Sequence, residues 1–81
     1  MWIKTKNGDA VNMEYATAIE SAELKTGDYE VAVGIHEGKC KIIAIFDNEE
    51  NAKACIAEII HALNGDEKVG YSFSWLNKAV F

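Results

Sequence analysis

The 81-residue chain contains no arginine and no proline, and it has only two cysteines and two histidines. Arginine is the side chain best suited to bidentate phosphate recognition, so its absence weighs against nucleic acid as a partner. Without proline or low-complexity tracts nothing marks a linker, and the length allows one domain with a small core. No apolar run reaches the roughly 20 residues of a membrane span, and no signal peptide is evident at the N-terminus.

The sequence has few side chains that could act in catalysis or bind a metal ion. Cys40 and Cys55 lie in hydrophobic segments without a CxxC spacing, so we expect two buried, reduced thiols in the cytoplasm rather than a disulfide or a nucleophile. His36 and His61 lack the spacing of a metal site. No glycine-rich phosphate loop or nucleophile motif is present. The sequence predicts no catalytic residue, no cofactor and no metal, and therefore a protein that is not an enzyme.

Charge is negative and evenly spread. Thirteen acids against eight lysines give a net charge of −5, with no acidic tail and no basic arm. Non-specific nucleic-acid binding is therefore not expected. The acidic pair Glu49 and Glu50 is explained by helix capping.

Alternating polar and apolar residues predict antiparallel strands. Asn7-Gly8 separates extended segments 2–6 and 9–14 and predicts a hairpin with a type I′ turn. Residues 15–24 continue extended, although their alanines and glutamates also permit a helix. Two further strands follow, 29–36 and 40–46. The second of these is apolar on both faces, so it is either covered twice or open to a partner.

Residues 48–63 form the predicted helix. Asp47 is the expected N-cap because Glu50 follows at capping-box spacing, and Asn64-Gly65 predicts a left-handed C-cap. Apolar residues recur at helical spacing. We expect the helix to bury Ala52, Cys55, Ile56, Ile59 and Leu63 against Val31, Val33, Ile35, Ile42 and Phe46.

The expected fold class is α+β: an antiparallel four- to five-stranded meander with one C-terminal helix packed on one face. Residues 1–65 form the sheet and helix. Residues 66–81 form an aromatic strand or tail, part of the same domain or of a dimer interface. In this tail Tyr71, Phe73 and Trp75 alternate with serines. These rings either fold back onto the chain's own core or dock on another chain.

Partner binding is expected on the sheet face opposite the helix. Strict alternation places Ile43 and Ile45 on that face, beside a set of small residues: Ala16, Ala18, Ala22, Ala32 and Gly34. Such a face should not meet water in a stable monomer. The predicted partner-binding residues are Ile43, Ile45, Tyr71, Phe73 and Trp75, in a homodimer or against a host protein.

Three segments resemble a group of small uncharacterised proteins of Firmicute bacteria and their phages. They are residues 1–8, which begin Met1-Trp2-Ile3-Lys4-Thr5, residues 11–20, which begin Val11-Asn12-Met13, and residues 45–52, which contain Phe46-Asp47-Asn48-Glu49-Glu50-Asn51-Ala52. The resemblance implies a small sheet packed by one helix, in a bacterial or phage cytoplasm, and it implies no activity. Residues 66–81 depart from it.

Two functions compete on these grounds. The first is a non-enzymatic cytoplasmic protein-interaction module that self-associates. The alternative is a phage-encoded inhibitor of a host defence or nucleic-acid enzyme, acting by protein–protein binding or acidic mimicry. A small enzyme or metal protein would require a convergent polar pocket, which a single-layer sheet of this size rarely has.

Overall fold

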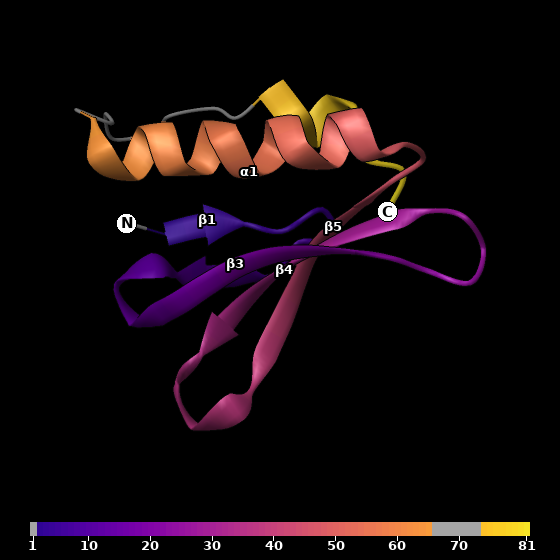
Figure 1. The fold of residues 1–81 in the computed structure, drawn as a ribbon. Helices are drawn as coiled ribbons and strands as arrows, with labels where there is room; N and C mark the ends of the chain where they lie inside the picture. Colours follow the sequence, from indigo (N-terminus) through magenta and orange to yellow (C-terminus); the bar gives the residue numbers. More distant parts are fainter. Residues whose placement is uncertain (1, 66–73) are drawn as a thin grey trace.

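The computed structural model describes residues 2–65 and 74–81. The strands are β1 (Trp2–Lys4), β2 (Ala10–Asn12), β3 (Ala16–Glu23), β4 (Tyr29–Ile35) and β5 (Cys40–Phe46). They are joined by short 3-10 turns η1 (Met13–Tyr15) and η2 (His36–Gly38), and followed by helix α1 (Glu49–Asn64) and the 3-10 turn η3 (Ser74–Asn77). Helix α1 lies across one face of the antiparallel sheet (Figure 1). The predicted α+β class, with one helix on an antiparallel sheet, is confirmed.

The strands within residues 2–65 divide into two sheets. β1 pairs with β2, and β3, β4 and β5 form a separate three-stranded sheet in that order. The division occurs at η1, where the Asn12 side chain accepts a hydrogen bond of 3.1 Å from the Glu14 N–H. This turn buries Met13 and redirects the chain. The expectation of four to five strands in a single sheet is therefore not confirmed.

The three hairpins in the described part of the chain close in the same way, with a three-residue loop whose last residue is a glycine at positive φ. A backbone hydrogen bond of 2.7–2.8 Å joins the residues that flank each loop. This geometry is typical of three-residue loops that end in a left-handed glycine. The glycines are Gly8 (φ 100°), Gly27 (φ 91°) and Gly38 (φ 74°). The first hairpin is confirmed, but Lys6 belongs to its loop, so the predicted two-residue type I′ turn is wrong.

A β-bulge in β5 changes which side chains face the helix. Val31 pairs with Ala44 and Ala32 with Ile42, so Ile43 is an extra residue between them. Both Ile43 and Ala44 are 1% exposed, whereas Ile42 is 46% exposed. A bulge breaks the two-residue alternation of a strand. The predictions that Ile43 faces outward and that Ile42 lies under the helix are therefore wrong.

Helix α1 begins one residue later than predicted. Asn48 is the N-cap, and its side chain accepts a hydrogen bond of 2.8 Å from the Asn51 N–H. Asp47 instead accepts a hydrogen bond from the Asn48 side-chain amide, so the prediction of Asp47 as the cap is wrong. Aspartate and asparagine cap almost equally well, which explains the misassignment. Gly65 is extended rather than left-handed, which corrects the predicted C-cap.

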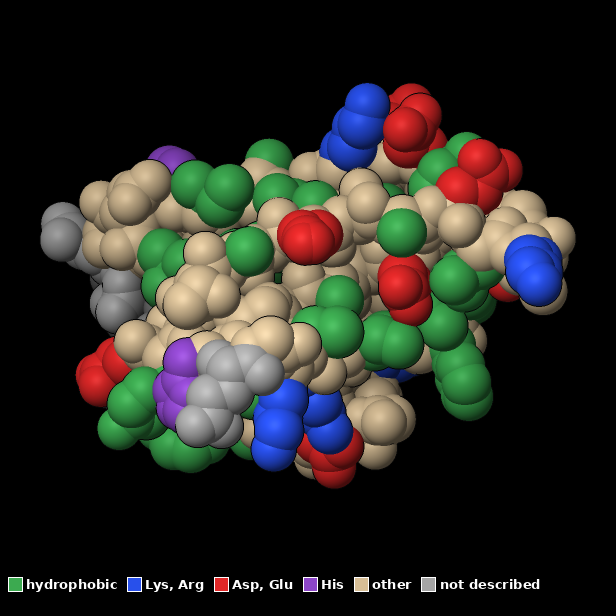
Figure 2. All heavy atoms as spheres, turned by 60° about the horizontal axis from the view of Figure 1, so that its bottom comes forward, with side chains coloured by type: hydrophobic (Ala, Val, Ile, Leu, Met, Phe, Trp, Pro, Cys, Tyr) green, Lys and Arg blue, Asp and Glu red, His purple; other side chains and the backbone are tan. Residues whose placement is uncertain are grey.

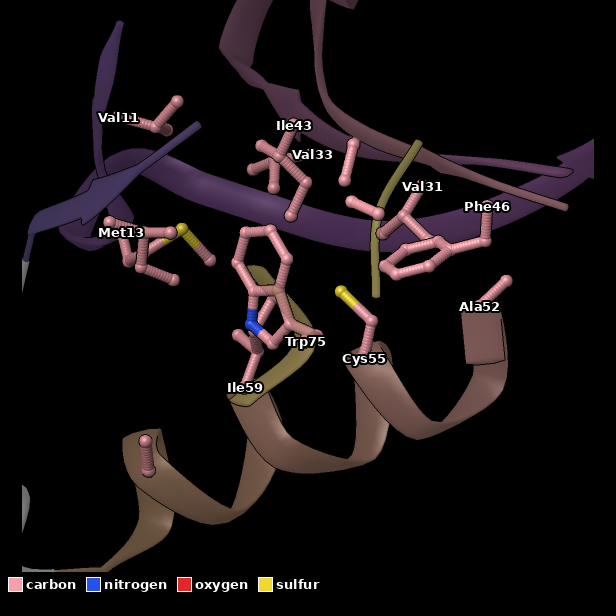
Figure 3. Close-up of a cluster of buried hydrophobic side chains, with 14 residues drawn as sticks. Val11, Met13, Val31, Val33, Ile43, Phe46, Ala52, Cys55, Ile59 and Trp75 are labelled. Carbon is pink, nitrogen blue, oxygen red and sulfur yellow. The ribbon is translucent and has the colours of Figure 1, made fainter. Parts of the chain in front are cut away.

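The core lies between α1 and the sheet (Figure 3). The helix contributes its buried residues, which are Ala52, Cys55, Ile59 and Ala62, and the sheet contributes Val31, Val33, Ile43 and Phe46. Ile56 is only partly buried, Ile35 is half-buried, and Leu63 is 40% exposed, so these predicted core positions lie at the margin. Ala62 takes the place that was expected for Leu63.

Part of the tail folds back onto this core. Trp75 is 2% exposed and meets Phe46 edge-on, with ring centroids 6.4 Å apart. Its backbone N–H donates to the Glu58 carboxylate at 3.3 Å. Residues 74–77 are a 3-10 turn, so the predicted strand is wrong there. Tyr71 and Phe73 lie outside the described residues.

Candidate functional site

The structure separates the residues that were predicted to bind a partner. Ile43 and Trp75 are enclosed in the core, and of the three predicted residues that it describes only Ile45 lies on the face opposite α1, where it is half-buried. Sequence reasoning missed Ile42, which the bulge turns to that face in place of Ile43.

The face of β3, β4 and β5 opposite α1 is called the outer face here. Its side chains form three cross-strand rows: Ala22, Glu30 and Ile45; Glu20, Ala32 and Ile42; Ala18, Gly34 and Cys40. Figure 2 turns this side of the molecule toward the viewer and shows hydrophobic side chains at the surface with carboxylates between them. Within residues 2–65 and 74–81, no helix or strand packs across it. The outer face is thus a largely apolar surface in contact with water.

Segments from two distant parts of the chain cover the edge of β5. The Lys6 N–H donates to the Ile43 carbonyl at 2.9 Å, and Ile45 exchanges backbone hydrogen bonds of 2.7 Å with Val80 and Phe81. A hollow of about 200 Å³ lies at this edge, lined by Asn7, Ile42, Ile43, Ala44, Ile45 and Phe81. Ile42, Ile45 and Phe81 are called the β5 patch here.

Phe81 dominates the exposed surface of the β5 patch. Phe81 is 72% exposed, more than any other large hydrophobic residue that the structure describes. Aromatic rings contribute strongly to interface energetics when they become buried. The β5 patch therefore combines a hollow with an adjacent exposed ring.

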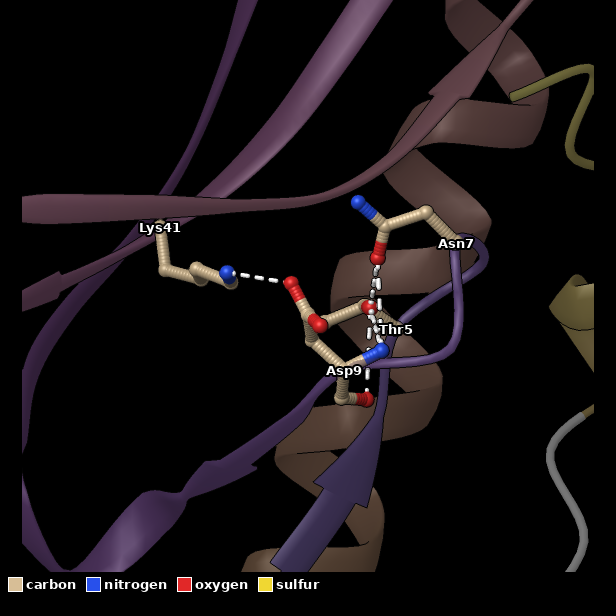
Figure 4. Close-up of polar contacts among 4 residues, drawn as sticks. All are labelled: Thr5, Asn7, Asp9 and Lys41. Atoms are coloured by element: carbon tan, nitrogen blue, oxygen red, sulfur yellow. Dashed lines mark hydrogen bonds and ion pairs between the residues drawn. The ribbon is translucent and has the colours of Figure 1, made fainter.

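A wider groove of about 620 Å³ is lined by β1, β2 and the hairpin that joins β4 to β5. Trp2 and Tyr15, which are 66% and 61% exposed, stand beside it with Val11 and Ile35. Lys41 also lines it and forms an ion pair of 2.6 Å with Asp9 (Figure 4). The groove offers a ligand two aromatic rings and the Lys41 side chain, which is paired with Asp9.

The loop between β1 and β2 holds Asp9, the ion-pair partner of Lys41, in place. The buried Thr5 hydroxyl accepts a hydrogen bond of 3.0 Å from the Asp9 N–H, and the Asn7 side chain accepts one of 3.3 Å from the same N–H.

One sequence signal could have indicated that Trp2 points outward. Side chains of neighbouring strand residues point to opposite faces, so Trp2 lies on the other face from the buried Ile3.

The two cysteines have different environments, and both are free thiols. Cys55 is fully buried, and this burial, with a smaller contribution from the Glu58 carboxylate, raises the pKa of its thiol to about 12. It is therefore a packing group and not a nucleophile at neutral pH. Cys40 is exposed at the start of β5, which corrects the expectation that both thiols are buried.

Among the described residues, no group of three or more histidine, cysteine, aspartate or glutamate side chains is arranged to hold a metal ion. No helix in that part of the chain is both long and apolar enough to cross a membrane. No protein-family model matches the chain, and no curated protein or solved structure matches it either.

Proposed function

We propose that the chain is a non-enzymatic protein-interaction module that self-associates through the β5 patch. The observation that carries this proposal is the exposure of Ile42 and Phe81 beside a hollow, on a sheet face that no described helix or strand covers. Contiguous exposed apolar surface of this kind marks interaction sites in water-soluble domains.

A second copy fits this surface because the hollow and the exposed ring lie next to each other. A two-fold axis beside Phe81 allows the ring of each copy to enter the hollow of the other, which makes the contact self-complementary. Ala32 and Gly34, in the neighbouring strand, are small enough to permit close approach of a second sheet. Glu20 lies on β3, two strands away from Ile42, and stays at the solvated rim of the contact.

The expected dimer is weak. Burying Ile42 and Phe81 contributes at most about 1.5–3 kcal/mol for each side chain, from both copies. Association itself costs about 4–15 kcal/mol, so the balance favours a dissociation constant of about micromolar or above.

Sedimentation velocity over a wide concentration range tests the proposal. The wild-type sedimentation coefficient should rise with concentration, and Ile42→Lys and Phe81→Ser should each abolish the rise. Ile60→Lys is the matched control, because Ile60 is 45% exposed on α1 and Ile42 is 46% exposed on β5. A wild-type protein that stays monomeric at millimolar concentration, or an equal effect of all three variants, would refute the proposal.

A further inference from the structure

One edge of the three-stranded sheet carries unused backbone hydrogen-bonding groups. β3 is the first strand in the order β3, β4, β5, and it is eight residues long. The Leu24 N–H donates to the Asp28 carbonyl across the hairpin, which fixes the alternation along β3. Backbone groups of Ala18, Glu20 and Ala22 point toward β4, and those of Ile19, Ser21 and Glu23 point away from it.

The outward groups of β3 have no hydrogen-bond partner within residues 2–65 and 74–81. The β5 edge differs, because Lys6, Val80 and Phe81 bond to it. Folded proteins usually protect an open edge with charged residues, above all lysine, or with proline, a β-bulge or a covering segment. The bulge of β3 lies at its start, between Ala16 and Ala18, and therefore outside the segment from Ile19 to Glu23. Residues 16–23 contain neither lysine nor proline. This edge is therefore a template for another strand.

Charge along β3 indicates what kind of strand it accepts. Glu20 and Glu23 are both exposed, and they are the only charged residues between positions 16 and 23. Partial burial, together with the carboxylates of Glu23 and Glu49, raises the pKa of Tyr29, which faces Glu23 across the hairpin. Glu20 and Glu23 thus give this edge negative charge, which favours a positively charged partner.

We propose that the free edge of β3 binds an extended peptide with two lysine or arginine residues three positions apart, which adds to the sheet as a fourth strand. Glu20 and Glu23 are three residues apart and therefore lie on opposite faces of the strand, so one basic side chain meets each of them. This goes beyond self-association through the β5 patch, because it uses the opposite edge of the sheet.

A second copy of β3 fits this edge poorly. Antiparallel pairing must join outward-pointing residues of both copies. Pairing Ile19 with Ser21 of the other copy places the two Glu20 side chains directly opposite each other, and pairing Ile19 with Ile19 places them diagonally. Like charges in these positions destabilise a sheet. A basic peptide replaces this repulsion with attraction.

Amide hydrogen exchange measured by NMR tests the proposal. The probe is an acetylated and amidated eight-residue peptide of threonine and valine with two lysines three positions apart. At saturating peptide, the amides of Ile19, Ser21 and Glu23 should become protected from exchange. The amides of Glu20 and Ala22 should be protected already in the free protein, because they point toward β4.

Two controls separate strand addition from simple charge attraction. The same peptide, methylated on the alternate amide nitrogens that would face β3, should not bind, because it keeps its charge and loses its donors. The double variant Glu20→Gln with Glu23→Gln should raise the dissociation constant about two- to thirtyfold. Glu50→Gln, on the exposed first turn of α1, should leave it unchanged.

Three results would overturn the inference. Equal binding of the methylated peptide would reduce the contact to charge attraction. Protection of Ser21 that rises with protein concentration in the absence of peptide would assign the edge to a second copy. Absence of protection at millimolar peptide would show that the edge is closed. Repeating the titration with Ile42→Lys separates these results from self-association through the β5 patch.

Discussion

Raising the pH above 9 should destabilise the protein through a single buried thiol, that of Cys55. Burial and the nearby Glu58 raise the pKa of this thiol from 9.0 to about 12 in the folded state. Between these two values the unfolded chain has released the proton and the folded chain still holds it. The contribution of Cys55 to the free energy of unfolding is therefore fully present below pH 9 and is lost as the pH rises toward 12.

The magnitude follows from the two pKa values. At pH 10 the free energy of unfolding should be about 1.4 kcal/mol lower than at pH 7 through this group alone, and the full loss above pH 12 is about 4 kcal/mol. A small domain has a total stability near the lower end of about 5–15 kcal/mol, so the loss at pH 10 is a substantial fraction.

Urea denaturation of the wild type and of Cys55→Ala at pH 7, 8, 9 and 10 measures the effect. Lysine and tyrosine titrations are common to both proteins, so only the difference in stability between them is informative. The stability advantage of the wild type at pH 7 should shrink by about 1.4 kcal/mol at pH 10. Cys40→Ala, at the exposed cysteine, should follow the wild type. A pH-independent difference between wild type and Cys55→Ala would refute the reasoning.

Three further predictions concern the helix and the packing against it. Ile59→Ala should lower the free energy of unfolding by about 2–5 kcal/mol, because Ile59 is fully buried, and Ile60→Ala should cost much less, because Ile60 is 45% exposed; urea denaturation compares the two. Asn48→Ala should cost about 0.5–2 kcal/mol by the same measurement, and an equal cost for Asp47→Ala would contradict the assignment of the N-cap. Trp75→Ala should cost about 3–5 kcal/mol and lower the thermal midpoint, whereas an unchanged midpoint would show that the ring does not contribute to the core.

The features of the fold that were predictable from the sequence are those with local signals. The helix follows from the spacing of Ala52, Cys55 and Ile59, and the hairpins follow from glycines at the turns. The position of the N-cap was not predictable to the residue, because Asp47 and Asn48 are adjacent and equivalent as caps.

The apolar character of the outer face was predicted from the sequence, but one of its two isoleucines was not. Its alanines and Ile45 follow from strict alternation along the strands. Ile42 faces outward in place of Ile43 because of a bulge in the pairing of β4 with β5, and no residue type in β5 indicates this bulge. The placement of Trp75 depends on packing against Phe46 and α1, which are distant in sequence. Such contacts leave no periodic pattern.

The closure of the β5 edge has a consequence for folding during synthesis. The Lys6 amide and residues 80–81 bond to neighbouring positions of the same strand, although more than 70 residues separate them along the chain. Contacts between such distant residues form late, because the intervening chain must first be ordered. On the ribosome, the nascent chain holds an incomplete edge and an incomplete core until Trp75 and Phe81 have emerged. Until Phe81 has emerged, the unfinished core and edge of the nascent chain are accessible to chaperones, to proteases and to other nascent copies of the same chain.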